Sequence, residues 1–303
     1  MRFSVIVVCL NPGKKLKSTL DSIFGQTCRD FEVIIKDGGS TDGSVEPWMG
    51  CAEDAGQAAD QAQAVVSGGS MRLTQEKDRG IYDAMCGGRV RFIQEKDRGI
   101  YDAMNQAVTH AVGEFLLFLN CGDRFPDRHI LERTSERIDA EQASGRNMDR
   151  LVLYGDTLSE KNDATIASPP QITGFTCYRN IPCHQSCFYS SSLCREKSYN
   201  LQYEIRADYD HFLWCFYRAG ARFIHMGFPV ASYEGGGYSE SRENRARDRQ
   251  EHRLITQSYM GKAELFRYRA IMVCTLAPLR TAMAESKIFS GVYEWVKAQM
   301  YRG

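Results

Sequence analysis

Apolar and polar positions form two patterns along the first half of the chain, short continuous apolar runs and apolar residues at helical spacing. Short apolar runs rich in β-branched residues predict buried strands at Phe3 to Leu10, Phe31 to Lys36 and Phe115 to Leu119. Apolar residues recur at helical spacing between the first two runs, and again over Ile100 to Val112. Strand and helix signals that alternate in this way favour an α/β fold, with a mostly parallel sheet and helices on its faces.

The second half is less regular. A fourth apolar run predicts a strand at Leu151 to Tyr154, and helical spacing returns from about Asp208 to Ala219. Further strands are predicted at Arg222 to His225 and Val230 to Tyr233. A glycine run then precedes a charged helical stretch, so we expect one α/β domain over residues 1–239 and a helical extension over 240–303. Two weaker predictions are a surface helix within Glu46 to Gly69 and a helix near Arg128 to Ala140.

The chain also repeats itself. GGSMRLTQEKDRGIYDAM at 68–85 returns at 87–104 as GGRVRFIQEKDRGIYDAM, an offset of 19 residues. Two units are too few for a stacked repeat architecture, so we interpret 68–104 as a local tandem duplication. Gly87 and Gly88 follow the first copy, and each disfavours a helix by about 1 kcal/mol relative to alanine. We therefore expect the second copy to occupy the fold and the first to form a surface insertion.

Composition narrows the class of protein. Lysine plus arginine (38) equals aspartate plus glutamate (38), so no global field attracts nucleic acid. The chain has no run of eighteen apolar residues and no cleavable leader pattern, which predicts a cytoplasmic protein without a membrane span. Eleven cysteines without a CxxC pair favour reduced thiols. A structural zinc site stays an alternative, built from Cys177, Cys183, His184, Cys187 and Cys194.

Acidic loops follow two of the predicted strands. Asp37 opens DGGSTDGS, and Asp123 closes the sequence NCGD. In open α/β sheets ligands bind outside the carboxyl ends of the strands, and carboxylate oxygens suit a divalent cation that carries a diphosphate. The residues alone leave alternatives open. Asp37 is also ordinary turn chemistry, and Asp123 can equally cap or close the turn before the next helix.

Six blocks in order resemble bacterial family 2 glycosyltransferases of the GT-A fold. They are SVIVVCLN, FEVIIKDGGSTDGS, EKDRGIYDAMNQAVTHAVGEFLLFLNCGD, HQSCFY, RADYDHFLW and GGGYS, and they span about Arg2 to Ser239. The likeness is to the branch that builds exopolysaccharide, capsule or lipopolysaccharide units, the colanic-acid type among them. It implies a GT-A, Rossmann-like sheet and transfer of a sugar, with inversion, from a UDP-sugar donor to a glycan or lipid-linked hydroxyl acceptor.

The resemblance also implies roles for individual residues. Asp208 matches the catalytic base, and Asp123 matches a ligand of Mn²⁺ or Mg²⁺. The family often writes this metal motif as Asp-x-Asp, whereas Asn120 and Gly122 hold the earlier places here. The positions that match the nucleotide-sugar site are Asp37, Asp97, Arg98, Asn120, His184 and Gln185.

Several of these residues have a competing interpretation. Asp208 can instead be the N-cap of the helix that it begins, and Asp210 is the rival base. Asp42 is expected to cap the segment that follows it. Arg98 can equally be a solvated charge, and His184 a structural residue.

Two further expectations concern partners. The tail from Phe266 to Val296 mixes apolar and basic residues, which suits an amphipathic helix at an anionic membrane surface, although packing on the catalytic domain is the alternative. We therefore expect peripheral attachment at the inner face of the cell membrane.

Because Asn120 departs from the family motif, an inactive GT-A domain that acts as a binding or assembly module is the second functional interpretation.

Overall fold

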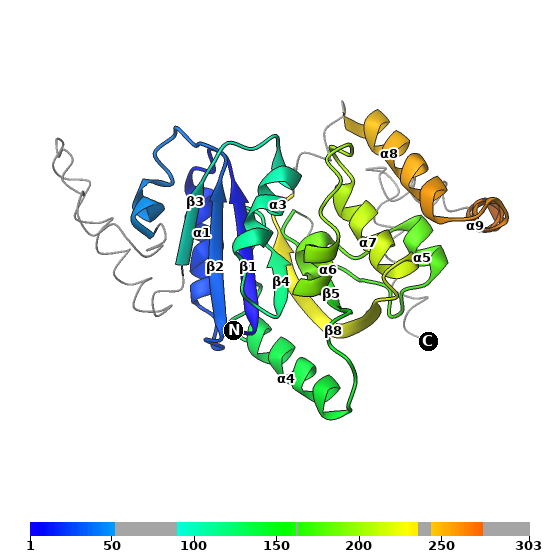
Figure 1. The fold of residues 1–303 in the computed structure, drawn as a ribbon, viewed down its shortest axis with the longest axis horizontal. Coiled ribbons are helices and arrows are strands. Elements are labelled where there is room, and N and C mark those ends of the chain that lie inside the picture. The colour runs from blue at the N-terminus through cyan, green and yellow to red at the C-terminus, as the bar shows by residue number, and fades with distance from the viewer. Residues whose placement is uncertain (52–89, 162, 236–243, 275–303) are drawn as a thin grey trace.

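A mixed sheet forms the centre of the computed structural model, which describes residues 1–51, 90–161, 163–235 and 244–274 (Figure 1). Within these residues the strand order is β3-β2-β1-β4-β7-β5-β6, and β8 pairs with β5. The strands are β1 (Phe3–Cys9), β2 (Phe31–Asp37), β3 (Val90–Gln94), β4 (Phe115–Phe118), β5 (Leu151–Ser159), β6 (Ala164–Ile166), β7 (Cys187–Ser190) and β8 (Arg222–Tyr233).

The first four strands of this order are parallel to one another. Phe3 of β1 lies opposite Phe31 of β2 and Phe115 of β4, and β3 continues the parallel set beyond β2. Strands β1, β2 and β4 are buried along almost their whole length, because helices cover both faces of a parallel sheet. Strand β7 is antiparallel to its two neighbours, β4 and β5. The mostly parallel α/β sheet expected from the sequence is confirmed.

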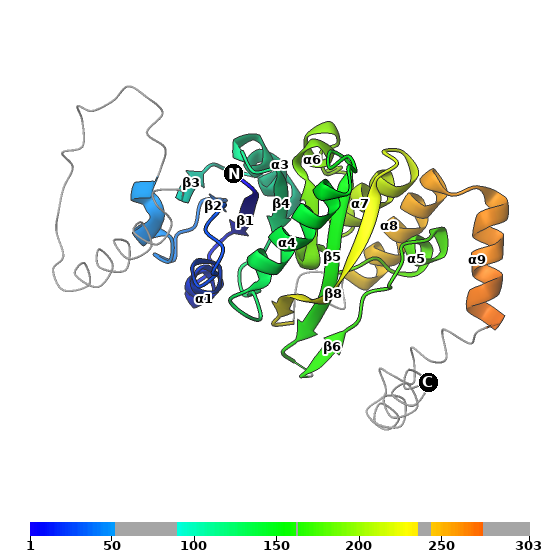
Figure 2. The same ribbon diagram turned by 90° about the horizontal axis from the view of Figure 1, so that it is seen from below.

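Helices pack on both faces of the sheet (Figures 1 and 2). Alternate residues of β1 point to opposite faces, so that Val5 packs with α1 and α4, whereas Ile6 packs with α3 and α7. The helices are α1 (Lys14–Phe24), α3 (Ile100–His110), α4 (Ile130–Ala143), α5 (Gly174–Arg179), α6 (Ser191–Glu196), α7 (Ala207–Tyr217), α8 (Asn244–Tyr259) and α9 (Lys262–Cys274), with 3₁₀ turns at Glu46–Cys51 and His184–Ser186.

The second copy of the repeat provides two regular elements. It forms β3, which pairs with β2, and the start of α3 (Ile100 to Met104), a helix that packs on β1 and β2. The first copy lies outside the described residues, as does the part of the predicted Glu46 to Gly69 helix that follows Cys51. None of the described helices is both long enough and apolar enough to cross a bilayer.

The sequence predicted two strands where the structure has one. The two strands predicted at Arg222 to His225 and Val230 to Tyr233 are a single strand, β8. Gly227 has a φ of 76°, and the pairing of β8 with β5 shifts register beside it. A left-handed glycine at a bulge bends the strand without ending it, so the break with Gly227 and Pro229 between the two predicted strands did not mark a turn.

His211 on α7 gives the fold a measurable acid sensitivity. Burial lowers the pKa of its imidazole from 6.5 to about 4. Between these two values the unfolded chain binds a proton that the folded chain excludes, so stability falls as the pH falls through this window. We expect His211 to account for about 2 kcal/mol of lost unfolding free energy between pH 7 and pH 5. Urea unfolding of His211→Gln should show that much less acid destabilisation than the parent protein, and equal losses would contradict this.

Candidate functional site

Loops after β1 and β2 are tied together at the carboxyl edge of the sheet. The amide of Asn11 donates to Ser40 Oγ (2.7 Å), and the amide of Thr41 donates to Asn11 Oδ1 (2.8 Å). Asp42 Oδ2 accepts from the amide of Gly13 (2.9 Å), while its Oδ1 accepts from Ser44. Asp42 therefore turns the segment that follows it, as expected, and also anchors the β1 loop.

Asp37 ends β2, and its carboxylate organises its own loop. Oδ2 accepts from the amides of Gly39 (3.0 Å) and Ser40 (2.8 Å) and from Gln94 Nε2 (2.9 Å), and Oδ1 accepts from the Ser40 hydroxyl. Burial acts to raise the pKa of Asp37, but the hydrogen bonds from Ser40 and Gln94 outweigh it and hold that pKa below its usual value. The turn chemistry is thus present, and the contact with a nucleoside stays a prediction.

Asp97 lies beside this loop, held by a buried lysine. Lys36 Nζ is 3.3 Å from Asp97 Oδ2 and also donates to the carbonyl of Asp37 (3.1 Å). A Cβ on Gly38 would lie 2.7 Å from the same Asp97 oxygen, so only glycine allows this approach. Arg98, by contrast, is 80% exposed and pairs with Asp102 (3.3 Å). The structure brings Asp37 and Asp97 together and directs Arg98 to the surface.

Asp123 sits in a buried acidic corner on the loop after β4. Only 4% of the residue is exposed. Burial raises the pKa of its carboxyl to about 7, and the negative charges of Glu234 and Glu160 add to this, although the Glu234 amide and Lys15 oppose it. Asp123 does not cap α4, whose N-cap is His129. Such a site concentrates negative charge that a cation would stabilise.

Neighbouring residues fix the conformation of this loop. Gly122 donates its amide to Thr19 Oγ1 (2.9 Å), and the same hydroxyl donates to the carbonyl of Asp123 (2.9 Å). Asn120 Oδ1 is buried and has no hydrogen-bond partner within the described ranges. Lys15 Nζ lies 2.6 Å from Glu234 Oε2, at the end of β8. Glu234 was not predicted from the sequence, where its one signal is its place directly before the glycine run.

Asp208 lies in the first turn of α7 and is held by a tyrosine. The hydroxyl of Tyr101 is 2.9 Å from Asp208 Oδ1 and 2.7 Å from the carbonyl oxygen of Ile205. The N-cap of α7 is Arg206, so the capping alternative for Asp208 was wrong. Tyr101 belongs to the second repeat copy, and sequence reasoning missed it although both copies carry the RGIYDAM sequence.

Asp210, the rival base, is engaged elsewhere. Its Oδ1 accepts from the hydroxyl of Tyr259 on α8 (3.0 Å), and its Oδ2 lies 3.3 Å from Lys197 Nζ. Only 4% of Asp210 is exposed. An acceptor hydroxyl cannot approach a carboxylate that is packed in this way, so the geometry favours Asp208.

The segment from Cys183 to Gln185 lies near enough to Asp123 and Asp208 for their charges to act on the Cys183 thiol. Burial raises the pKa of the Cys183 thiol, a hydrogen bond with Thr157 opposes this, and the negative charges of Asp123 and Asp208 raise the pKa further. His184 and Gln185 are buried, and His184 stacks on Phe118 with ring centroids 5.1 Å apart. Among the described residues neither ring nitrogen of His184 has a hydrogen-bond partner. The two ring nitrogens of His184 are therefore polar atoms that a ligand near Asp123 and Asp208 could bind.

The zinc alternative is not supported. Across the described parts of the chain, no three or more His, Cys, Asp or Glu side chains are grouped so that they could hold a metal ion. The cysteines proposed for that site, Cys177, Cys183, Cys187 and Cys194, are all free thiols.

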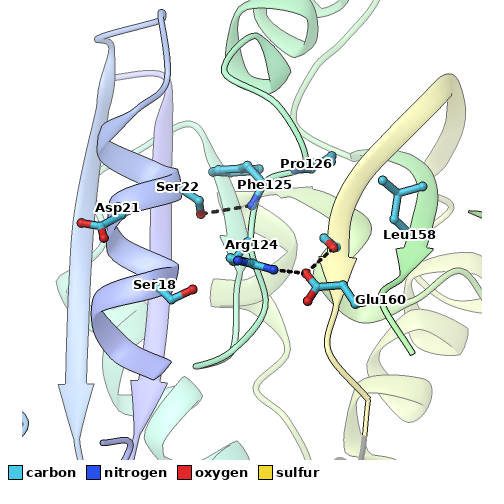
Figure 3. Close-up of a pocket in the computed structure, with 9 residues that line it drawn as sticks. Ser18, Asp21, Ser22, Arg124, Phe125, Pro126, Leu158 and Glu160 are labelled. Atoms are coloured by element: carbon cyan, nitrogen blue, oxygen red, sulfur yellow. Dashed lines mark hydrogen bonds and ion pairs between the residues drawn. The ribbon is translucent and has the colours of Figure 1, made fainter. Parts of the chain in front are cut away.

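A cavity of about 560 Å³ opens next to the Asp123 loop (Figure 3). It lies between α1 and the edge formed by β5 and β8, and none of the predicted site residues lines it. Arg124 and Glu160 form an ion pair on its wall (2.5 Å), and Ser232 Oγ also donates to Glu160 (2.6 Å). These three polar side chains bond to one another, and the cavity lies beside the candidate site without including its residues. The lining residues are Ser18, Asp21, Ser22, Arg124, Phe125, Pro126, Leu158, Glu160 and Ser232.

Comparison with known sequences decides the family. Residues 4–54 match the family model described as glycosyl transferase family 2. Over 241 residues the chain is 31% identical to the PGL/p-HBAD biosynthesis glycosyltransferase of Mycobacterium tuberculosis. This alignment covers 79% of each of the two chains. This chain belongs to glycosyltransferase family 2. An uncharacterised glycosyltransferase of Mycobacterium tuberculosis is 28% identical to this family 2 glycosyltransferase over 216 residues, covering 69% of this chain and 67% of that one.

Solved structures confirm the GT-A fold of the family 2 glycosyltransferase. TarS of S. aureus superimposes with a TM-score of 0.60 at 17% identity, and the match covers 95% of this chain but only 44% of that longer one. A mannosyltransferase from Pyrobaculum calidifontis, solved in complex with GDP-Man and Mn²⁺, gives a TM-score of 0.59 at 16% identity and covers 99% of this chain and 84% of its own. At these identities the likeness establishes the fold.

Proposed function

We propose that this family 2 glycosyltransferase transfers a sugar, with inversion, from a UDP-sugar to a hydroxyl acceptor. One observation carries the proposal: the buried carboxyl of Asp123 and the tyrosine-held carboxylate of Asp208 come from distant parts of the chain, yet both lie near enough to Cys183 for their charges to raise its pKa. An acidic pocket for a metal-bound diphosphate and a separate proton acceptor are the two groups that such a transfer needs.

A divalent cation fits the residues at Asp123. Asn120 Oδ1, which has no partner in the described part of the chain, and the carboxylates of Asp123 and Glu234 are oxygen donors of the hard kind that Mn²⁺ or Mg²⁺ prefers. When bound, the ion would neutralise charge that develops on the departing diphosphate. The mannosyltransferase neighbour was solved with GDP-Man and Mn²⁺, and a shorter form of TarS was solved with UDP and with UDP-GlcNAc, which supports a metal and a nucleotide sugar here as well.

Asp208 acts as the general base in this proposal. Tyr101 donates to Oδ1 and so orients the carboxylate, which leaves Oδ2 to take the proton of the acceptor hydroxyl. As the O–H bond breaks, the acceptor oxygen bonds to the anomeric carbon and the bond to the diphosphate breaks on the opposite face. The configuration at that carbon is therefore inverted. His184 and Gln185 line the sugar side, and Asp37 and Asp97 lie nearest the nucleoside.

The acceptor in our proposal is a glycan or lipid-linked intermediate of bacterial surface polysaccharide assembly, of the exopolysaccharide, capsule or lipopolysaccharide type. The protein would then work in the cytoplasm at the inner membrane face. Helix α9 supports such contact, since Phe266 (75% exposed) and Val273 (68%) lie one heptad apart with Lys262 and Arg269 on the same exposed stripe.

Nucleotide release tests the proposed function. The full chain is incubated with UDP-glucose, UDP-galactose, UDP-GlcNAc or GDP-mannose, each with Mn²⁺ or with EDTA, and free nucleotide is measured over time. We expect at least one UDP-sugar to be turned over faster with Mn²⁺ than with EDTA. Binding of UDP without turnover of any donor would favour the inactive binding module instead.

A further inference from the structure

A single glutamate on α8, Glu251, accepts hydrogen bonds from the backbone amides of the turn that leads into α7. Glu251 Oε1 accepts from the amide of Glu204 (2.9 Å), and its Oε2 accepts from the amides of Ile205 (3.0 Å) and Arg206 (2.9 Å). Only 5% of Glu251 is exposed. Three successive amides that converge on one anion form a nest, and hydrogen bonds to a charged acceptor are stronger than neutral ones.

A second contact from α8 holds the same turn through a side chain. Arg206 Nε lies 2.6 Å from Asp248 Oδ1, and Arg206 Nη2 lies 2.9 Å from Asp248 Oδ2. This is a two-pronged guanidinium–carboxylate pair, which fixes orientation as well as distance. The guanidinium also lies over the ring of Tyr209, 5.4 Å from its centroid. Asp248 and Glu251 are three residues apart on one face of α8, so this helix contacts the 204–206 turn at two points.

These contacts from α8 affect the position of Asp208. Arg206 is the N-cap of α7, and Asp208 follows it by two residues. The carbonyl of Ile205, whose amide Glu251 holds, accepts from the same Tyr101 hydroxyl that reaches Asp208 Oδ1. The position of the Asp208 carboxylate therefore depends on where the 204–206 turn is held.

We propose that Glu251, assisted by Asp248, is a positioning residue that sets the Asp208 carboxylate against the acceptor hydroxyl. The inference rests on the proposed role of Asp208 as the base. Helix α8 thereby becomes part of the catalytic apparatus. A displacement of about 1 Å in a reacting group can cost on the order of 10²-fold in rate, so loss of the nest should lower turnover far more than donor binding.

Glu251→Gln is the decisive variant, because it keeps the shape of the side chain but turns an N–H₂ group toward backbone donors. We expect kcat for nucleotide release from the preferred UDP-sugar to fall on the order of 10- to 100-fold. The Kd of UDP with Mn²⁺, measured by calorimetry, should stay within about twofold of the parent value. Glu136→Gln, an exposed carboxylate on α4, is the charge-matched control and should leave both values unchanged.

Asp248→Asn provides a second test if Glu251→Gln does not fold. It leaves the nest intact and weakens the Arg206 pair, so kcat should fall by a smaller factor at unchanged UDP affinity. A fall in kcat and UDP affinity together, in the variant that folds, would indicate general damage and overturn the positioning role. Parent-like kcat in the folded variant would overturn it equally.

A double-mutant cycle separates this inference from the proposed function. If Glu251 acts through Asp208, Glu251→Gln should have almost no further effect on the residual turnover of Asp208→Asn. Independent, multiplying effects would refute the coupling while leaving Asp208 as the base. If Asp208→Asn itself keeps parent-like turnover, the proposed base is wrong and the positioning inference falls with it.

Discussion

Asp208→Asn should lower turnover of the preferred UDP-sugar on the order of 10²- to 10⁴-fold while UDP affinity stays within about twofold. The amide keeps the shape of the carboxylate and can still accept the Tyr101 hydroxyl, but it cannot take a proton from the acceptor. Initial rates of nucleotide release and calorimetry with UDP and Mn²⁺ measure the two quantities on the same protein.

Asp210→Asn is the matched control for this prediction. Asp210 lies two residues further along α7, but its carboxylate faces Tyr259 and Lys197 and not Tyr101. We expect its removal to lower thermal stability and to leave turnover nearly intact at a temperature where the variant is folded. Loss of turnover in Asp210→Asn, with parent-like rates in Asp208→Asn, would transfer the base role to Asp210.

Asp123→Ala should remove the effect of metal on UDP binding. In the parent protein UDP should bind more tightly with Mn²⁺ than with EDTA, because the diphosphate and the loop oxygens share the ion. Loss of residues that merely support a metal ligand costs on the order of 10- to 100-fold in metal affinity, so loss of a ligand should cost at least this much. Calorimetry of UDP with Mn²⁺ and with EDTA measures the difference in both proteins.

Glu160→Gln is the control for Asp123→Ala. Glu160 contributes negative charge to the same corner, but its Oε1 is held by Arg124 and Ser232, so its removal should preserve the metal effect. Equal affinity of the parent protein for UDP with and without metal would contradict a metal at this site.

The parallel part of the sheet could be predicted from the sequence because its strands are apolar on both faces. Runs such as FSVIVVC and FEVIIK leave little choice but burial, and both formed strands. Strand β7 was not distinguished, since the four residues Cys187–Ser190 carry little pattern and their place depends on pairing with β4 and β5. Pairing partners far away in the chain cannot be read from local periodicity.

The residues of the candidate site also differ in whether local sequence could identify them. Asp37, Asp123 and Asp208 were identified because they stand at the end of a strand, in the loop after a strand and in the first turn of a helix, where motif matching applies. Tyr101 and Glu251 were missed because their roles arise from contacts across 107 and 46 residues of chain. A polar side chain on a helix face gives no sign, in the sequence, of which distant loop it will hold.

The anomeric configuration of the product tests the central claim most directly, because it reports on which face of the sugar the acceptor attacks. Proton NMR can follow the first sugar released or transferred from the preferred α-linked UDP-sugar, before mutarotation obscures it. A β-configured product is the predicted result, since one base opposite the metal-bound diphosphate permits attack only from the far face. An α-configured first product would contradict the account.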